Sequence, residues 1–233
     1  MNSFGSVVAE PQEEGWTVVK TNRKPVLSPA KLSKLKRSLG IISDSAEAIV
    51  NSVVKTSKSY SFPSYLRDLQ FESVIALGIG SFGNSYISKA QLLVLHRLIT
   101  AYRPTEAFCY DPVLTVDEKK ALHQLGMQSS LGSSVPDHSS TLFFMPHCDK
   151  SLYLDILKQH RRRLSNLHII GNDFRIYALR STGEEGKLWT TIAKYTRTRG
   201  FHVTPALPPE VLSDTVFTSF PEEHATALEN LLS

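Results

Sequence analysis

A glycine-rich run that follows a short apolar stretch constrains the fold of this chain more than any other feature. Residues 74–77 are apolar and predict a buried strand, and Gly78, Gly80 and Gly83 then form a G-x-G-x-x-G pattern. Residues 84–102 follow with helical spacing. A Rossmann-type nucleotide-binding turn needs this order, because glycine lets backbone N–H groups approach an anion at the start of a helix.

Polar residues are expected at the carboxyl ends of successive strands. Ser81 and Asn84 follow the first strand, and Asp111 ends the second, where a Rossmann-type fold binds a ribose. His147 and Asn172 follow two later strands. Ligands bind at this edge of a parallel sheet. The predicted ligand-contacting residues are Gly78, Gly80, Ser81, Gly83, Asn84, Asp111, His147 and Asn172.

Several sharper chemical interpretations are disfavoured. The glycine turn is not a P-loop, because Asn84 stands where that motif has lysine. His147 and Cys148 are adjacent, and adjacent side chains in extended backbone point apart, which argues against a nucleophilic pair. No second Cys or His cluster supports a metal site. Asp149 and Asp173 are expected to cap helices. The alternative for the glycine turn is a tight turn that binds nothing.

Strands and helices alternate beyond residue 71. This pattern predicts an α/β, Rossmann-like, mostly parallel sheet with helices on both faces, preceded by a helical N-terminal segment. The expected strands are 73–77, 107–111, 141–146, 167–171 and 201–205, with a weak further strand at 126–131. The expected helices are 84–102, 116–125, 150–163, a short turn at 174–179, and 188–197. The expected domains are a flexible arm (1–28), a basic helical segment (29–59) and a single α/β domain (60–233).

The positive charge is concentrated at the N-terminus. The net charge is +4, and residues 1–60 hold nine Lys or Arg against five Asp or Glu, whereas the remainder is balanced. Nucleic-acid binding is therefore expected only through the basic N-terminal segment. Cys109 and Cys148 are placed on strands too far apart for a disulfide, which indicates a reducing compartment. No apolar stretch predicts a membrane span or a signal peptide.

Five blocks of sequence resemble one known family. The blocks are GIGSFGNSYISKAQLLVLHRL (78–98), FCYDPVLT (108–115), TLFFMPHCDKSLYLDIL (141–157), HIIGNDFRIY (168–177) and DTVFTSF (214–220). Their order and spacing are similar to those of the sensitivity-to-red-light-reduced family. The resemblance implies a nuclear and cytoplasmic regulatory protein with protein partners, linked to circadian clock input, clock-gene expression and haem biosynthesis. It implies no catalytic residue.

Two functions follow from these patterns. The first is a regulatory protein with a cleft for a small nucleotide-like ligand, either S-adenosylmethionine or a dinucleotide. The alternative is an S-adenosylmethionine-dependent, methyltransferase-like enzyme, since that fold also has a glycine turn and an acid after the second strand. Ala76 stands two residues before Gly78, where methyltransferases commonly have an acid, and this weighs against the enzyme.

Overall fold

The apolar run before the glycines forms β1 (Ser73–Leu77), which is buried along its whole length, as predicted. The computed structural model that shows it describes residues 45–130 and 140–233. The other strands are β2 (Glu106–Tyr110), β3 (Thr141–Met145), β4 (Leu167–Asn172), β5 (Arg197–Gly200) and β6 (Thr215–Ser219). The α-helices are α2 (Ala46–Ser57), α3 (Tyr86–Tyr102), α4 (Val116–Gln124), α5 (Lys150–Gln159), α6 (Phe174–Arg180), α7 (Gly183–Tyr195) and α8 (Ala225–Leu231). The 3₁₀ helices are η1 (Ser64–Leu66), η2 (Arg161–Asn166), η3 (Pro209–Val211) and η4 (Glu222–His224).

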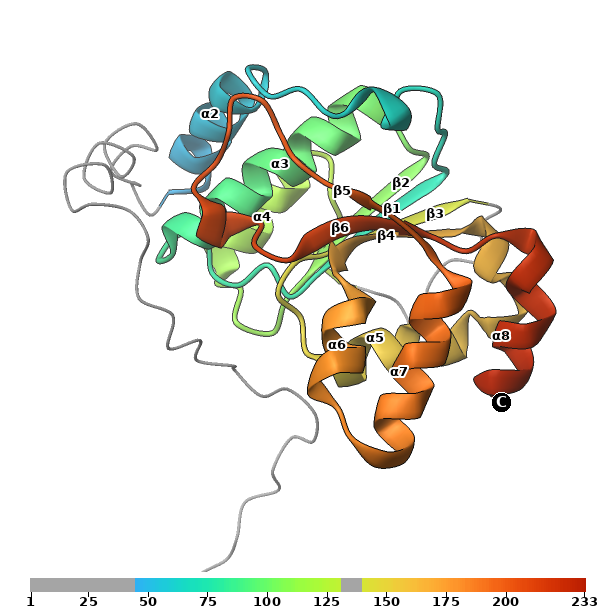
Figure 1. Ribbon diagram of the computed structural model, residues 1–233. Helices are drawn as coiled ribbons and strands as arrows, with labels where there is room; N and C mark the ends of the chain where they lie inside the picture. The colour runs from blue at the N-terminus through green and yellow to red at the C-terminus, as the bar shows by residue number, and fades with distance from the viewer. Residues whose placement is uncertain (1–44, 131–139) are drawn as a thin grey trace, which may run out of the picture.

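The strands form one sheet in the order β2-β1-β3-β4-β6-β5 (Figure 1). β2, β1, β3 and β4 pair in parallel, whereas β6 is antiparallel to both of its neighbours, β4 and β5. The sheet is therefore mixed but mostly parallel, which confirms the expected Rossmann-like class. The strand order reverses between β1 and β3, so the topological switch point lies there.

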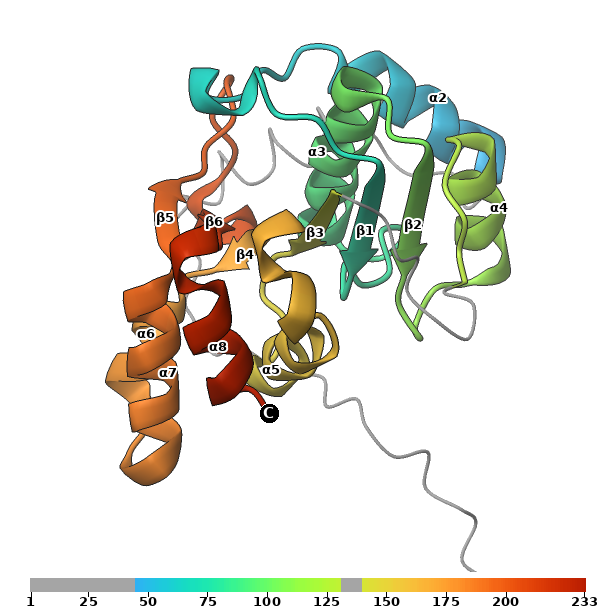
Figure 2. The same ribbon diagram turned by 90° about the vertical axis from the view of Figure 1, so that its right-hand side faces the viewer.

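Helices cover both faces of the sheet, as predicted (Figure 2). Alternate residues of β1 pack into two different hydrophobic cores, because successive side chains in a strand point to opposite faces of the sheet. Val74 and Ala76 pack in a cluster with residues of α2, α3 and α4. Ile75 and Leu77 pack in a second cluster with residues of α5, α6, α7 and α8. Most of α3 is buried, and α2 packs against it.

At the C-terminal side of the sheet, one expected strand was wrong and one strand was missed. The strand expected at 201–205 is not one: Phe201 and Val203 are buried in the core, but β5 lies earlier, at Arg197–Gly200. β5 is a mostly exposed edge strand with two arginines, so it lacks the apolar run of a buried strand. β6 was not predicted as a strand at all.

Helix boundaries account for the remaining differences. The helix expected over 150–163 ends at Gln159, and the 3₁₀ helix η2 follows, interrupted at Arg163 by non-helical backbone angles. α7 begins at Gly183, five residues earlier than expected. Of the weak strand at 126–131, Gln128 forms an isolated parallel bridge to Phe108. The arm (1–28) and residues 29–44 of the basic segment lie outside the described residues, so that domain division stays a prediction.

Within residues 45–130 and 140–233, no helix combines the length and apolar character needed to cross a membrane.

Candidate functional site

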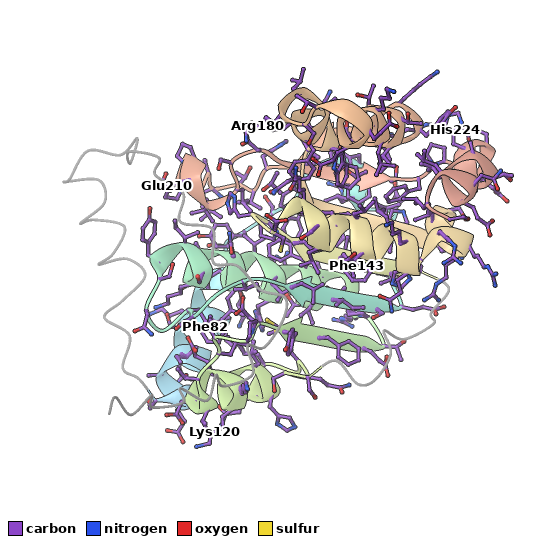
Figure 3. The ribbon with its side chains drawn as sticks, turned by 90° about the horizontal axis from the view of Figure 1, so that it is seen from below. Phe82, Lys120, Phe143, Arg180, Glu210 and His224 are labelled. Carbon is purple, nitrogen blue, oxygen red and sulfur yellow. The ribbon has the colours of Figure 1, made fainter. Side chains whose placement is uncertain are left out.

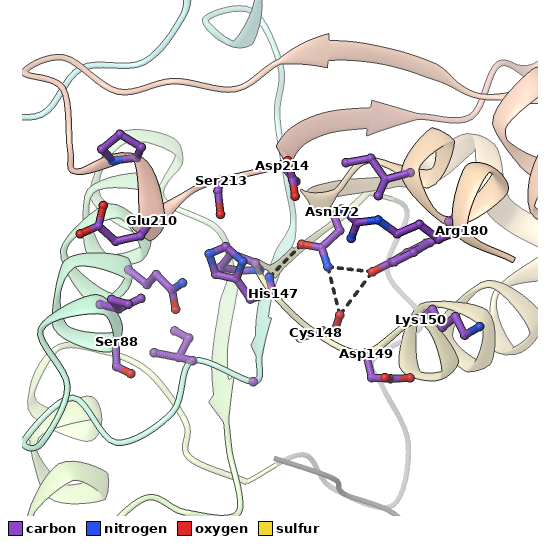
Figure 4. A pocket seen from close by; sticks show the side chains of 18 of the residues that line it. Ser88, His147, Cys148, Asp149, Lys150, Asn172, Arg180, Glu210, Ser213 and Asp214 are labelled. Atoms are coloured by element: carbon purple, nitrogen blue, oxygen red, sulfur yellow. Dashed lines mark hydrogen bonds between the residues drawn. The ribbon is translucent and has the colours of Figure 1, made fainter. Parts of the chain in front are cut away.

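A cavity of about 720 Å³ opens at the carboxyl ends of β1, β3 and β4 (Figure 4). Six segments line it: the start of the glycine turn, the first turns of α3, the turn between β3 and α5, the end of β4, one side of α6 with the residue after it, and residues within 209–214, which lead into β6. This place is the topological switch point, where open α/β sheets bind their ligands. The polar side chains that line the cavity are Tyr86, Ser88, Gln91, His147, Cys148, Asp149, Lys150, Asn172, Tyr177, Arg180, Ser181, Glu210, Ser213 and Asp214.

The structure divides the predicted site residues into two groups. Gly78, His147 and Asn172 line the cavity. The other five, Gly80, Ser81, Gly83, Asn84 and Asp111, are not among its lining residues. They belong to the glycine turn and the end of β2. Figure 3 shows Phe82 of this turn toward Lys120 of α4, whereas Arg180 and Glu210 lie at the opposite end of the molecule. A ligand role for the second group stays a prediction.

Asp111 already has two backbone donors. Its carboxylate accepts hydrogen bonds from the N–H of Gly80 at 2.8 Å and the N–H of Val113 at 3.0 Å. Only 7% of the residue is exposed. Gly80 has φ +79°, which a residue with a side chain rarely adopts, and this conformation turns its N–H toward Asp111. The acid at the end of β2 thus fixes the first half of the glycine turn.

Glu118, on α4, fixes the second half of the turn. Its carboxylate accepts hydrogen bonds from the Gly83 N–H at 2.6 Å, the Thr115 N–H at 2.8 Å and the Ser81 hydroxyl at 2.8 Å. Burial acts to raise the pKa of Glu118, but these hydrogen bonds outweigh it, and the pKa is lowered. The side chain is therefore a buried carboxylate ion at neutral pH.

Sequence reasoning did not identify Glu118 as a functional residue. A signal was present, since Thr115 and Glu118 have the T-x-x-E spacing of a helix capping box, and the structure contains that box. The contact with Gly83, however, joins residues 35 positions apart.

The N–H groups expected to bind a ligand anion are thus occupied by two carboxylates of the protein. Gly80 donates to Asp111, and Gly83 donates to Glu118. A phosphate placed on the same donors would have to displace a carboxylate and lie beside a like charge. The glycine turn is built as an internal anion site, and the cavity lies next to it.

Asn172 holds the turn between β3 and α5 in place (Figure 4). Its side-chain oxygen accepts from the His147 N–H at 2.9 Å, and its side-chain nitrogen donates to the Cys148 carbonyl at 3.0 Å and the Tyr177 hydroxyl at 2.7 Å. His147 has φ +63°, a left-handed conformation that is rare for residues other than glycine. The three hydrogen bonds of Asn172 stabilise this strained turn at the cavity wall.

The imidazole of His147 lies in the middle of the cavity wall (Figure 4). Its Nε2 is 3.0 Å from the Val211 carbonyl, which can only accept, so the proton is assigned to Nε2. The Gln91 side chain donates to the same carbonyl, also at 3.0 Å. In the neutral ring Nδ1 is then an acceptor. Val211 thereby connects α3, the β3–α5 turn and η3.

Cys148 is poorly suited to nucleophilic chemistry. Its thiol donates to the Leu77 carbonyl at 3.2 Å. Burial, together with the negative charges of Asp111 and Asp149, raises the pKa of Cys148 to about 12, so it is a thiol at neutral pH. Cys109 and Cys148 are both free, as predicted.

The expected helix caps are confirmed. Asp149 accepts from the Ser151 N–H at 2.9 Å at the start of α5, and Asp173 accepts from the Arg175 N–H at 2.9 Å at the start of α6. In the described parts of the chain, no three His, Cys, Asp or Glu side chains gather in a way that could hold a metal ion.

Known proteins show sequence similarity to parts of this chain. A protein of Arabidopsis thaliana named SENSITIVITY TO RED LIGHT REDUCED 1 is 37% identical over 73 residues, which are 29% of this chain and 26% of that protein. SRR1-like proteins are 28% identical in Mus musculus (43% of this chain, 44% of the protein) and 24% identical in Drosophila melanogaster (54% and 48%). The matched segments thus span between about a quarter and a half of the lengths of these relatives.

A solved structure titled "cmcI-N160 SAH" aligns with 89% of this chain and 98% of its own, at 13% identity and a TM-score of 0.40. The SRR1 domain family matches residues 41–231, which include every element of the sheet and its cavity. Since that match covers most of the sequence, and since curated relatives carry the same name, the chain belongs to the SRR1 family, the one that its five sequence blocks resemble.

Proposed function

We propose that this SRR1 domain is a regulatory module whose cleft binds a small nucleoside-type ligand that carries no phosphate on the glycine turn. S-adenosylmethionine is the leading ligand of this class. One observation carries the proposal: a cavity of about 720 Å³ lies at the switch point while Asp111 and Glu118 occupy the glycine turn beside it.

The occupied turn separates the two cofactors that the sequence leaves open. A dinucleotide places its pyrophosphate on the turn and the helix N-terminus. Here the Gly80 and Gly83 N–H groups donate to carboxylates, so a pyrophosphate would lose these two donors and lie beside two negative charges. A nucleoside with a neutral or cationic 5′ substituent needs no such donors. This difference supports S-adenosylmethionine over a dinucleotide.

The chemistry of the cavity wall disfavours covalent catalysis by its own side chains. The Cys148 thiol has a raised pKa and donates to a carbonyl, and His147 Nε2 donates to Val211, so neither is arranged as an activated nucleophile with its base. Methyl transfer is the second candidate function, because S-adenosylmethionine is a methyl donor. It is tested by following S-adenosylhomocysteine production after the ligand and partners are known.

Thermal-shift and calorimetric titrations test the ligand class. The panel comprises S-adenosylmethionine, S-adenosylhomocysteine and adenosine, then NAD, NADP and ADP, and finally haem. A ligand at about 100 times its Kd stabilises the folded state by about 2.7 kcal/mol. Adenosine-type ligands are expected to do so. If only the phosphate-bearing ligands bind, the proposed ligand class is wrong. If no ligand of the panel shifts the Tm, the proposal of ligand binding is refuted.

A blocking variant locates the site. The Ser213 side chain lies at the cavity near His147 in Figure 4, so Ser213→Trp is expected to fill the cleft and abolish the ligand shift. Ser64→Trp, at an exposed position in η1 that does not line the cavity, is the matched control and should keep the shift. Asp111→Ala separates the sequence-based prediction from this one. If Asp111 binds the ribose, the variant should lose ligand binding and keep its stability. If Asp111 fixes the glycine turn, the variant should lose stability.

We extend the proposal to the physiological role implied by the sequence blocks, namely clock-gene expression and haem biosynthesis regulation, in the nucleus and cytoplasm and through protein partners. Cells lacking the protein, complemented with the wild type, Ser213→Trp or Ser64→Trp, provide the test. The amplitude of rhythmic clock transcripts and the haem content are measured in each. If cleft-blocked protein restores both as well as the wild type does, the cleft is not part of the regulatory function.

A further inference from the structure

Glu210 is one of the residues that line the cavity. Its Oε1 accepts from the Tyr86 hydroxyl at 2.6 Å, whereas Oε2 is buried and has no hydrogen-bond partner among the described residues. Burial raises the pKa of Tyr86, and the hydrogen bond to the negative Glu210 raises it further, so the phenol stays a donor. A carboxylate can only accept, and a buried acceptor without a donor is unfavourable. Oε2 is therefore the oxygen of Glu210 that is left to accept a further hydrogen bond.

The chain around Glu210 holds this carboxylate in position. Pro208 and Pro209 precede it, and each fixes a backbone angle. Val211 follows, and its carbonyl accepts from both Gln91 and His147. Glu210 is thus held between α3 and the β3–α5 turn by contacts on both sides of it in the sequence.

Arg180 presents a free cation at the opposite end. It is the last residue of α6, it is exposed and lines the cavity, and its guanidinium has no hydrogen bond or ion pair within the described part of the chain. The neighbouring cation differs, because Lys150 is bound to Glu185 at 2.7 Å. Figure 4 shows Arg180 and Glu210 on opposite sides of His147. An unpaired guanidinium suits a carboxylate, which it can bind with two parallel hydrogen bonds.

We infer that the cleft binds an amino-acid-bearing nucleoside in one orientation, with ribose hydroxyls donating to Glu210 Oε2 and the amino-acid carboxylate on Arg180. This inference rests on the proposed function and deepens it, since it names which ligand groups are read and by which residues. It also gives the ribose a carboxylate other than Asp111, whose oxygens accept from Gly80 and Val113.

Two ligands and two variants test the orientation by calorimetry. S-adenosylhomocysteine has both the ribose and the amino acid, whereas 5′-methylthioadenosine lacks the amino acid. Arg180→Gln is expected to weaken S-adenosylhomocysteine about tenfold and to leave 5′-methylthioadenosine within twofold, because a charge-assisted hydrogen bond contributes about that factor. Glu210→Gln retains an acceptor for Tyr86 and is expected to weaken both ligands about tenfold.

Matched controls are Arg67→Gln and Glu222→Gln, at exposed positions that do not line the cavity, and both should bind like the wild type. If the wild type binds these ligands and Arg180→Gln weakens both equally or neither, the assigned orientation is overturned while the proposed function stands. If Glu210→Gln binds both as tightly as the wild type, the ribose assignment is overturned. A wild type that binds neither ligand overturns the proposed function and this inference together.

Discussion

Replacing Glu118 with glutamine tests the central structural claim, that the glycine turn is fixed by a buried carboxylate. The glutamine keeps the shape of the side chain but removes its charge and turns one oxygen into a donor. The three hydrogen bonds that Glu118 accepts, at 2.6 to 2.8 Å, are weakened because their acceptor is no longer charged. One buried N–H then faces the amide NH₂ and has no acceptor. A hydrogen bond to a charged group contributes about 1.5–3 kcal/mol, and an unsatisfied buried donor costs about 1–3 kcal/mol.

These contributions overlap, so we expect Glu118→Gln to lower the free energy of unfolding by about 3–4 kcal/mol. For a domain of this size that corresponds to a fall in Tm of about 10 °C. Urea denaturation followed by tryptophan fluorescence and circular dichroism measures the free energy, and calorimetry measures the Tm. Asp117→Asn is the control: Asp117 is one residue away and exposed, and among the described residues its side chain forms a surface ion pair with Lys120, so we expect a change below about 1 kcal/mol.

The pH dependence gives an independent readout of the same carboxylate. Its pKa is lower in the folded protein than the ordinary value of 4.5. Its contribution to stability is therefore complete above about pH 4.5 and is lost as the pH falls through the folded pKa. Glu118→Gln should remove that part of the acid loss. A variant as stable as the wild type, with an unchanged acid limb, would refute the internal anion site and return the turn to phosphate ligands.

Three further predictions use other parts of the chain. Gly78→Ala should destabilise the fold by about 1–3 kcal/mol in urea titrations, because φ is +68° and the new Cβ would lie 2.6 Å from Cys148 Sγ; an unchanged midpoint would contradict the close contact. Burial, with Arg97 and Lys58 nearby, lowers the pKa of His96, whose ring is 2.8 Å from the Ser57 hydroxyl. Its contribution to stability is full above about pH 6.5 and declines as the pH falls toward the folded pKa, so His96→Gln should flatten that loss in denaturation measured between pH 7.5 and 5.5. Nucleic-acid binding, measured by salt titration on duplex DNA and structured RNA, should fall steeply with salt and disappear on deletion of residues 1–40; binding that survives the deletion would place the site on the neutral body.

The parallel part of the fold was predictable because its signals are local. β1 is recognisable from the apolar run 74–77 directly before Gly78, and the helix after the turn is recognisable from the helical spacing of its apolar residues. β5 and β6 gave weaker signals. β5 has two arginines because it is an edge strand, and β6 (TVFTS) mixes threonines with apolar residues although it lies inside the sheet. Burial of Thr215 and Thr218 is set by neighbouring strands, not by their own type.

The candidate site was predictable in place but not in detail. The carboxyl ends of the strands do gather His147, Asn172 and Gly78 at one cavity, as the alternating pattern predicts. Glu210 could not be found in this way, because it precedes an antiparallel strand and does not follow a parallel one. Glu118 contacts the glycine turn across 35 positions of sequence, which no local pattern reveals. The capping-box spacing predicts only its contact with Thr115.

Because β6 runs in the reverse direction, one wall of the cleft is formed by a segment that enters a strand, whereas the other walls follow the ends of strands. Thr215, the first residue of β6, pairs with Asn172, the last residue of β4, so the segment before β6 arrives at the edge that the parallel strands leave. Residues 209–214 can therefore vary in length and sequence without changing how any parallel strand connects to its helix. Ligand preference within such a domain can diverge through this one incoming segment, while the glycine turn and the sheet that carries it stay the same.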